Sequence, residues 1–387
     1  MTLFGRGDRS IWGRWYWTID RPLLGMILVL IGAGLVAVAA ASPAASQRLS
    51  GADFRYGDLF FLKRQVMWVM IGLPLLIGTS MLPKVWVKRL AIVGTIGGIV
   101  AMGLLPLIGS ERNGAVRWLD FGGVGFQPSE FLKPMFVVAS AWILALKFDD
   151  PDVPAIPASG AILILIAALL MIQPDLGQTV LISAIWLAQA FIAGLSMMVV
   201  AVIAGVCLVG LAVAYLFVPH VTSRIDRFFT GEGDNYQVER SLDAMRSGGL
   251  FGTGPGEGQA KFSLPEPHTD YIFAVIGEEF GVIACFAIAA LFMAIIVRVV
   301  VQLFEEEDPF VTLAASGLVC QLGLQAFINM SVSMNLMPSK GMTLPFVSHG
   351  GSSFAALALG TGMLLALTRR NRFLSRSRGE PAQVQVA

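Results

Sequence analysis

The sequence has 387 residues, of which 56% are hydrophobic and only 14% are charged. Soluble domains carry about 25% charged residues, so this composition excludes a soluble globular protein and makes the bilayer the solvent for most of the chain. The formal net charge of +1 carries no information about nucleic acid, and no basic block indicates a nucleic-acid partner.

Ten apolar runs follow one another along the chain, and most have the roughly 17–25 residues that a membrane-spanning helix needs. They lie at 22–41, 65–82, 90–109, 128–146, 158–173, 176–194, 197–218, 271–301, 310–332 and 343–367. The first run exceeds the roughly 7–15 residues of a signal-peptide core, so we expect a retained helix. The fifth and sixth runs flank Gln173-Pro174-Asp175-Leu176-Gly177, which favours two helices joined by a tight turn. The sequence therefore predicts an all-α integral membrane protein with about ten transmembrane helices.

Basic residues at both ends of the chain indicate the orientation. An even number of spans puts both termini on one side, and the arginines of the arms at 1–21 and 369–387 favour the cytoplasm by the positive-inside rule. The polytopic membrane domain then covers 22–368, and a large polar loop at 219–270, between the seventh and eighth helices, faces outward. Four basic residues that would lie outside weaken this bias: Arg48, Arg55, Lys63 and Arg64.

The polar loop contains one segment with helical spacing. Residues 237–248 are expected to form a short amphipathic helix, because three apolar residues fall on one face: Val238, Leu242 and Met245. Gly248 and Gly249 would end this helix, and the glycine-rich segment 252–256 is expected to act as a hinge. The loop would then close over a substrate, and the alternative is an unstructured, solvated loop.

Polar groups inside a bilayer cost several kcal/mol unless they are paired or face water, so each one needs a reason. Glu130 and Lys133 are three residues apart at the start of the fourth run and share a helix face. They form either an internal salt bridge that helps to hold helices together or the wall of a polar cavity. Arg117, beside Trp118, is either an interfacial anchor or a phosphate ligand that forms two parallel hydrogen bonds.

The tripeptide His268-Thr269-Asp270 stands just before the eighth run. Thr269 or Asp270 could simply cap the helix. Alternatively, Asp270 lies where the loop meets a membrane cavity, and partial desolvation there would raise its pKa and suit it to act as a general base. Glu278 and Glu279 follow in the same run, where two adjacent carboxylates are costly. At least one of them is expected to meet water or a cation, and a metal ion is one candidate.

The segment 337–353 interrupts the apolar pattern with glycine, proline and serine. A helix entry broken in this way leaves free N–H groups and a positive dipole end, which bind anions such as pyrophosphate, and Lys340 adds a positive charge. The alternative is that Gly350-Gly351-Ser352-Ser353 only allows close helix packing. No single motif decides the function.

Taken together, the motifs resemble the SEDS family, the shape, elongation, division and sporulation proteins. The resemblance runs in order from about residue 22 to 372 and rests on Arg117-Trp118, Gln127-Pro128-Ser129-Glu130, Gln173-Pro174-Asp175-Leu176-Gly177, the segment from His268 to Glu279, and Leu344-Pro345-Phe346-Val347-Ser348-His349-Gly350-Gly351-Ser352-Ser353. The segment 338–345 resembles division-type members, because elongation-type members tend to have a threonine before Gly341 and a proline in place of Thr343. His349 stands where the family usually has tyrosine, so the resemblance assigns no role to that side chain.

The resemblance implies a ten-helix peptidoglycan glycosyltransferase that polymerises lipid II, a disaccharide-pentapeptide on undecaprenyl pyrophosphate, for the division septum. Asp270 matches the family's key aspartate and would deprotonate the acceptor 4-hydroxyl, which attacks the anomeric carbon of the lipid-linked donor with inversion. The residues expected to contact the substrate are Arg117, Glu130, Lys133, His268, Thr269, Lys340, Ser348, Ser352 and Ser353.

The resemblance also implies a divalent cation, Mg or Mn, that helps to neutralise the leaving pyrophosphate, and no organic cofactor. The expected partners are a class B penicillin-binding protein transpeptidase and other division membrane proteins, and the expected location is the bacterial inner membrane at the septum. The alternatives are an elongation-type polymerase, a lipid II flippase and a scaffold without chemistry. The sequence shows no inverted repeat, which weakens the flippase, and a scaffold would leave Asp270 unexplained.

Overall fold

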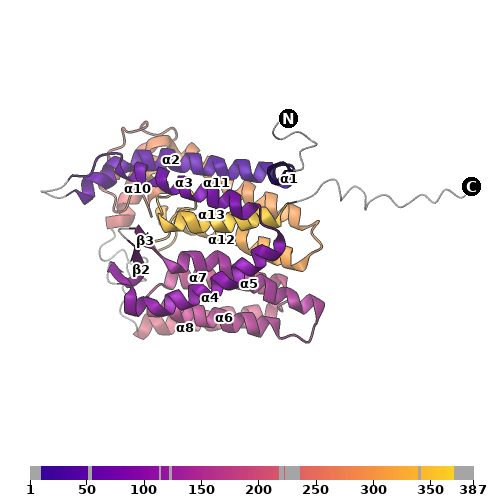
Figure 1. Cartoon of the computed structure of the whole chain (residues 1–387). Helices are drawn as coiled ribbons and strands as arrows, with labels where there is room; N and C mark the ends of the chain where they lie inside the picture. The colour runs from indigo at the N-terminus through magenta and orange to yellow at the C-terminus, as the bar shows by residue number, and fades with distance from the viewer. Residues whose placement is uncertain are drawn as a thin grey trace, which may run out of the picture.

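The computed structural model describes residues 10–50, 55–112, 115–121, 124–217, 222, 236–338 and 341–369. A bundle of long helices runs back and forth through the molecule (Figure 1). These are α2 (Arg21–Leu49), α3 (Phe60–Ser80), α4 (Lys84–Ile108), α5 (Pro128–Asp149), α6 (Ala155–Ile172), α7 (Leu176–Ile192), α8 (Met197–Phe217), α11 (Ile272–Leu303), α12 (Pro309–Ser333) and α13 (Ser352–Leu367). Eight of them are long and apolar enough to cross a membrane, and α7 and α13 are shorter apolar helices. The ten predicted runs thus correspond to ten helices, and the helical membrane class is confirmed.

Shorter elements mark the two ends of the bundle. The loop end carries α10 (Tyr236–Gly248), the 3-10 helix η1 (Ala260–Phe262) and an antiparallel sheet of β1 (Ser110–Arg112), β2 (Ala115–Phe121) and β3 (Val124–Phe126) (Figure 1). The terminal end carries α1 (Ile11–Thr18), where Arg369 donates a hydrogen bond to Thr18 at 3.0 Å. The sequence did not predict the strands, because two of them have three residues and are too short to leave a period-two pattern.

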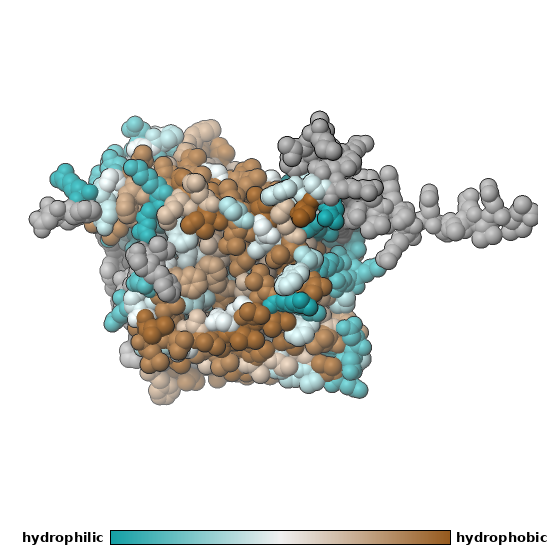
Figure 2. Space-filling view, viewed as in Figure 1, coloured by the Kyte–Doolittle hydropathy of each residue, from teal (hydrophilic) through white to brown (hydrophobic). Residues whose placement is uncertain are grey.

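A broad apolar belt lies between the polar ends of the bundle (Figure 2). Large apolar side chains stay exposed along it, including Val93 and Ile96 of α4, which are 69% and 60% exposed. Contiguous exposed apolar surface of this extent is unfavourable in water and marks a membrane contact. The chain is therefore a multi-pass membrane protein.

The helix α13 occupies the centre of the bundle, because every residue from Ser352 to Leu367 is buried. Small residues let the neighbouring helices approach it closely. A Cβ atom on Gly360 would lie 2.9 Å from Pro134 of α5, and one on Gly362 would lie 1.7 Å from Thr79 of α3. Close packing around small residues is the usual way in which membrane helices associate.

A kink at Gly281 divides α11, where the backbone adopts φ 79° and ψ 176°. The turn after α10 inserts at this kink. The N–H of Val282 donates to the carbonyl of Gly249 at 3.0 Å, and the N–H of Thr253 donates to the carbonyl of Glu278 at 2.9 Å. Backbone groups that the kink removes from the helix ladder therefore bond to this turn, which joins the polar loop to α11.

Replacing Gly281 with alanine is expected to destabilise the protein by about 3 kcal/mol, because the side chain meets both strain and overlap. The φ value is unfavourable for any L-residue with a side chain, and the new Cβ would lie 2.3 Å from the carbonyl oxygen of Leu250. Thermal unfolding in detergent measures the loss. Gly78→Ala in α3 is the matched control, because a Cβ there meets nothing within 4 Å. Equal midpoints for the two variants would contradict the prediction.

The predicted amphipathic helix at 237–248 is confirmed as α10, and Gly249 ends it with φ 56°. Its buried face includes Ser241 and Ala244, and the hydroxyl of Ser241 donates to the carbonyl of Ser333 at 2.8 Å. Of the predicted stripe, Leu242 and Met245 are half-buried, and the side chain of Val238 lies outside what the structure describes. α10 therefore rests on neighbouring helices through small residues.

The predicted hinge at 252–256 is fastened to α11 in this structure. The N–H of Gly254 donates to the carbonyl of Glu279 at 3.1 Å, and the N–H of Gly256 donates to the Glu279 carboxylate. A segment held by successive backbone hydrogen bonds does not have the freedom that a hinge needs, so the hinge prediction does not fit this geometry. Closure of the loop over a substrate stays a prediction.

Candidate functional site

Asp270 lies two residues before α11, at the loop end of the bundle, and is half-buried. Burial, and then the nearby Glu266 carboxylate, raise the pKa of Asp270 to about 7. The residue that precedes α11, Tyr271, makes no side-chain capping hydrogen bond, and neither Thr269 nor Asp270 caps the helix. The alternative that Thr269 or Asp270 caps α11 is therefore wrong. Asp270 instead combines partial burial with a pKa close to neutrality.

The segment 342–349 runs beside 268–270 and holds it. Ser348 donates from its hydroxyl to the carbonyl of Thr269 at 2.6 Å and accepts from the N–H of Leu344 at 2.8 Å. The N–H of His349 donates to the carbonyl of His268 at 2.8 Å. This segment was expected to be helical from residue 343, but α13 begins only at Ser352. The N–H groups of Val347 and Ser348 donate to the carbonyl of Leu344 in a local turn, and the N–H of His349 leaves the turn to bond to His268.

A buried asparagine on α12 clamps the two segments together. Asn329 donates from Nδ2 to the carbonyl of Asp270 at 2.9 Å and to the carbonyl of Met342 at 2.6 Å. Gly341, the residue before Met342, has φ 61°, and a Cβ there would lie 3.4 Å from Oδ2 of Asp270. The backbone at Gly341 thus approaches the Asp270 carboxylate closely. Asp270 is held by its backbone, which leaves its carboxylate available for chemistry.

Two histidines pack against each other next to Asp270. The ring of His268 lies 5.6 Å from that of His349 and 4.0 Å from that of Phe61, measured between centroids. Nδ1 of His349 shares a hydrogen bond with Oε1 of Gln65 at 3.0 Å, whereas Nδ1 of His268 has no partner among the described residues. Burial is the main cause that lowers the pKa of His268 to about 3 and that of His349 to about 4. Both rings are therefore neutral at pH 7.

The Glu130–Lys133 pair forms a buried salt bridge of 2.9 Å on α5. Gln178 of α7 donates to Glu130 at 2.7 Å, so the pair also joins two helices. This geometry matches the structural alternative for the pair. Near the same end of α5, Ser352 accepts from the N–H of Gln127 at 3.3 Å.

Ser353 closes the first turn of α13. Its hydroxyl donates to the carbonyl of Gly350 at 2.9 Å and lies 3.5 Å from the hydroxyl of Thr343. Of the residues proposed from sequence, His268, Thr269 and Asp270 are thus each held by a hydrogen bond to the backbone carbonyl, and Ser348 is one of the donors. Ser353 contacts Thr343 of the same segment 342–349.

Arg117 lies on β2 and is fixed to the turn between α6 and α7. Its guanidinium donates to the carbonyls of Gln173 at 2.8 Å and Pro174 at 2.7 Å, and lies 3.8 Å from the carboxylate of Asp175. Arg117 therefore has a structural task, which the sequence did not indicate because the two segments lie far apart in the chain. Lys340 lies outside the described residues.

Glu278 and Glu279 meet protein donors from the polar loop. The Glu278 carboxylate accepts from the N–H groups of Ala260 at 2.7 Å and Lys261 at 2.8 Å. Glu279 forms a buried salt bridge with Lys261. The expected cation is thus a lysine, which sequence reasoning missed. No group of three or more His, Cys, Asp or Glu side chains gathers anywhere in the described residues, so this pair does not fit a divalent-cation site.

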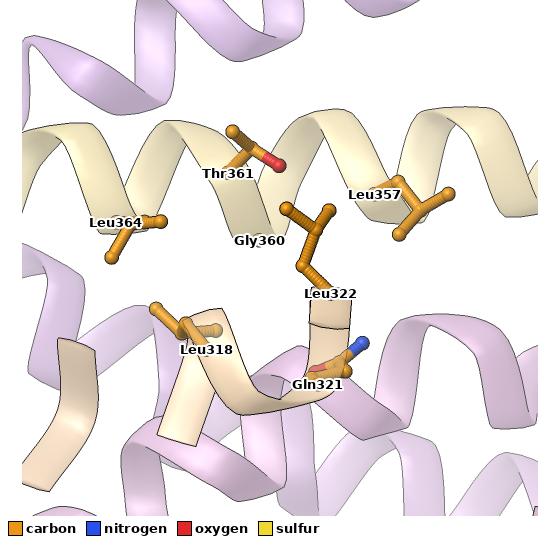
Figure 3. A pocket seen from close by; sticks show the side chains of 7 residues that line it. All are labelled: Leu318, Gln321, Leu322, Leu357, Gly360, Thr361 and Leu364. Atoms are coloured by element: carbon orange, nitrogen blue, oxygen red, sulfur yellow. The ribbon is translucent and has the colours of Figure 1, made fainter. Parts of the chain in front are cut away.

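A small pocket lies between α12 and α13 (Figure 3), and its walls are Leu318, Gln321, Leu322, Leu357, Gly360, Thr361 and Leu364. Its volume of about 10 Å³ is enough for about one water molecule. A sugar or lipid headgroup does not fit there. This pocket is therefore not a substrate site, and the candidate site rests on the residues around Asp270.

Comparisons with known proteins agree on one family. The model of the FtsW/RodA/SpoVE cell cycle proteins matches residues 21–373. A protein of Caulobacter vibrioides named "Probable peptidoglycan glycosyltransferase FtsW" is 41% identical over 368 residues, which cover 95% of this chain and 93% of that protein. A protein of Nitrosomonas europaea with the same name is 35% identical over 372 residues, with 92% and 95% covered.

Solved structures show the same fold. A chain of a peptidoglycan synthase complex superposes with a TM-score of 0.74 at 24% identity, over 94% of this chain and 99% of that chain. The rod shape determining protein RodA of Thermus thermophilus superposes with a TM-score of 0.65 at 25% identity, over 94% and 98%. The whole described bundle therefore has counterparts of known structure.

Proposed function

The chain belongs to the FtsW/RodA/SpoVE family of cell cycle proteins and is a peptidoglycan glycosyltransferase of the division type, and we propose that Asp270 is the general base with which it polymerises lipid II. The observation that carries this proposal is the placement of Asp270. Its carboxylate is half-buried at the loop end of the bundle, and its pKa is raised to about 7. A general base works best when its pKa lies near the working pH.

The reaction is an inverting glycosyl transfer. The 4-hydroxyl of the acceptor sugar attacks the anomeric carbon of the donor, its proton passes to the Asp270 carboxylate, and a new glycosidic bond forms. The bond from the anomeric carbon to the pyrophosphate oxygen breaks, and undecaprenyl pyrophosphate leaves. The clamp by Asn329 on the carbonyl of Asp270 would keep the base in position during this step.

The remaining candidates divide into two groups. Ser348 holds the backbone at Thr269, next to Asp270, and His268 places a buried ring, whose Nδ1 has no partner among the described residues, behind the base. Arg117 and Lys133 are engaged with protein acceptors. Contact of Arg117 or Lys340 with pyrophosphate stays a prediction, as does the divalent cation. Within the part of the chain that the structure describes, no three His, Cys, Asp or Glu side chains gather, so pyrophosphate oxygens would complete the coordination of such a cation there.

The orientation and partners follow from the same proposal. Both termini would face the cytoplasm of the inner membrane, and residues 219–270 would face outward, where lipid II presents its sugars. The chain would work at the division septum with a class B penicillin-binding protein transpeptidase and other division proteins. Its fold matches a chain of a peptidoglycan synthase complex, which supports a transpeptidase partner.

One assay separates the proposed enzyme from its rivals. Purified protein in vesicles receives fluorescent lipid II, and both polymer formation and exchange between leaflets are measured, with and without the transpeptidase partner. Glycan polymer is expected. Exchange between leaflets without polymer would support a flippase, and neither product in the presence of the partner would overturn the proposed activity.

The polymerisation rate is expected to fall as the pH drops through about 7, by about tenfold per pH unit at the acid end, because the protonated carboxyl cannot accept the acceptor proton. Titration of the neighbouring histidines does not contribute to this pH dependence. Their pKa values, lowered to about 3 and about 4, keep His268 and His349 neutral throughout the range. Initial rates in a constant-ionic-strength buffer series give the profile, and a flat profile across neutrality would contradict Asp270 as the base.

A further inference from the structure

A cavity of about 380 Å³ opens at the terminal end of the bundle, at the other end of the bundle from Asp270. Its lining comes from the start of α4, the end of α5 and the start of α12. Both signs of charge line it, together with aromatic rings: Lys84, Lys88, Trp142, Asp149, Asp308 and Phe310. The reaction proposed above uses none of these residues.

One charge pair in the cavity is already satisfied by the protein. Lys84 forms salt bridges with Asp308 at 3.3 Å and with Glu306 at 3.7 Å. The other oxygen of Asp308 caps α12 by accepting from the N–H of Phe310 at 3.1 Å. Lys84 therefore holds the start of α4 to the segment that leads into α12, and its charge is already engaged by two carboxylates.

The two other charged side chains that line the cavity, Lys88 and Asp149, form no ion pair among the described residues. The ammonium of Lys88 lies 5.1 Å from the ring centroid of Trp142 and 5.6 Å from that of Phe310, and within the described chain it forms no ion pair. Asp149 makes no hydrogen bond or ion pair with the residues that the structure describes. A cation and an anion, neither of them in an ion pair within the described chain, thus line one cavity whose other lysine is already engaged by carboxylates.

The helix ends reinforce this separation of charge. Lys84 is the first residue of α4, and no side chain caps that helix, so free N–H groups and a positive dipole end lie near Lys88. Asp149 is the last residue of α5, where the dipole end is negative and a carboxylate is unfavourable without a cation. The α4 side of the cavity attracts a phosphate, and the α5 side attracts an ammonium group.

We propose that this cavity binds the phosphoethanolamine headgroup of a membrane phospholipid, with the phosphate on Lys88 and the start of α4 and the ammonium on Asp149. A singly anionic headgroup would satisfy Lys88 but leave Asp149 unpaired. The rim favours a lipid over a soluble molecule. Val85, which lines the cavity, is 58% exposed, and Trp86 and Phe148 beside it are also exposed, so acyl chains could continue onto the apolar belt. The site would anchor the terminal end of the bundle to the bilayer surface.

Native mass spectrometry of lipid-depleted protein in detergent tests the site with dioleoyl phosphatidylethanolamine and dioleoyl phosphatidylglycerol at equal concentrations. Wild-type protein is expected to retain the ethanolamine lipid preferentially. Lys88→Met keeps the apolar stem over the rings and removes the charge, so it is expected to weaken binding about tenfold, the cost of one charge-assisted hydrogen bond. Asp149→Asn is expected to abolish the preference over the glycerol lipid.

Arg89→Met is the matched control, because Arg89 is the next residue on α4, stacks on Trp86 and does not line the cavity. It is expected to leave lipid binding unchanged. Lys88→Arg, which keeps the charge, is expected to retain binding and guards against a folding artefact. Equal retention of both lipids by the wild type, or equal losses in Lys88→Met and Arg89→Met, would overturn the site. Displacement by free phosphoethanolamine at the same concentration would overturn a lipid as its source.

Discussion

Asp270→Asn is expected to reduce glycan polymerisation by about 10²–10⁴-fold, the range that a general base contributes. The amide has nearly the same shape as the carboxylate but cannot accept the acceptor proton. Folding is expected to persist, because Asp270 is held through its backbone carbonyl by Asn329 and not through its carboxylate. Polymer formed from fluorescent lipid II by the purified variant measures the effect, and the thermal midpoint in detergent checks the fold.

Glu266→Gln is the matched control for this substitution. Glu266 is an exposed carboxylate in the same loop, and its charge raises the pKa of Asp270. Removing that charge is expected to keep polymerisation and to move the pH profile toward lower pH. Near-normal polymer from Asp270→Asn, or an equal loss in Glu266→Gln, would show that Asp270 is not the base.

The membrane helices could be predicted from sequence because their signal is local. A span needs a run of apolar residues of a certain length, whatever lies beside it. The predicted turn at Gln173-Pro174-Asp175 also has a local signal, and the structure confirms it, since α6 ends at Ile172 and α7 begins at Leu176. The same logic fails for β2, whose alternation is short and is stabilised by pairing with β1 and β3.

The candidate site could be predicted only in part, for a related reason. Asp270 lies where the sequence changes from a polar loop to an apolar run, and this change marked it as a candidate. Asn329 and Gln65 lie within other helices, far from Asp270 in the sequence. Asn329 bonds to the carbonyl of Asp270, and Gln65 bonds to the ring of His349, and both contacts exist only in the folded chain. The task of Arg117 at the α6–α7 turn is hidden in the same way.

Lys261→Met is expected to destabilise the protein by about 3–5 kcal/mol, because it would leave a buried carboxylate without its cation. Lys261 is 1% exposed, and its salt bridge to Glu279 joins η1 to the kinked part of α11. The N–H of Lys261 also donates to Glu278 at 2.8 Å. Loss of this salt bridge would free residues 262–269, which lead to Asp270. Polymerisation is therefore expected to fall together with stability.

A second substitution tests whether charge is the cause. In Lys261→Met with Glu279→Leu both charges are gone, and a buried ion pair replaced by apolar side chains is often neutral in stability. The double variant is therefore expected to regain most of the thermal midpoint that Lys261→Met loses. Asp243→Asn serves as the exposed control, because its 3.8 Å salt bridge with Arg240 lies on the surface of α10 and is worth about 0–1 kcal/mol. If Lys261→Met unfolds at the same temperature as Asp243→Asn, the buried pair does not hold the loop to α11.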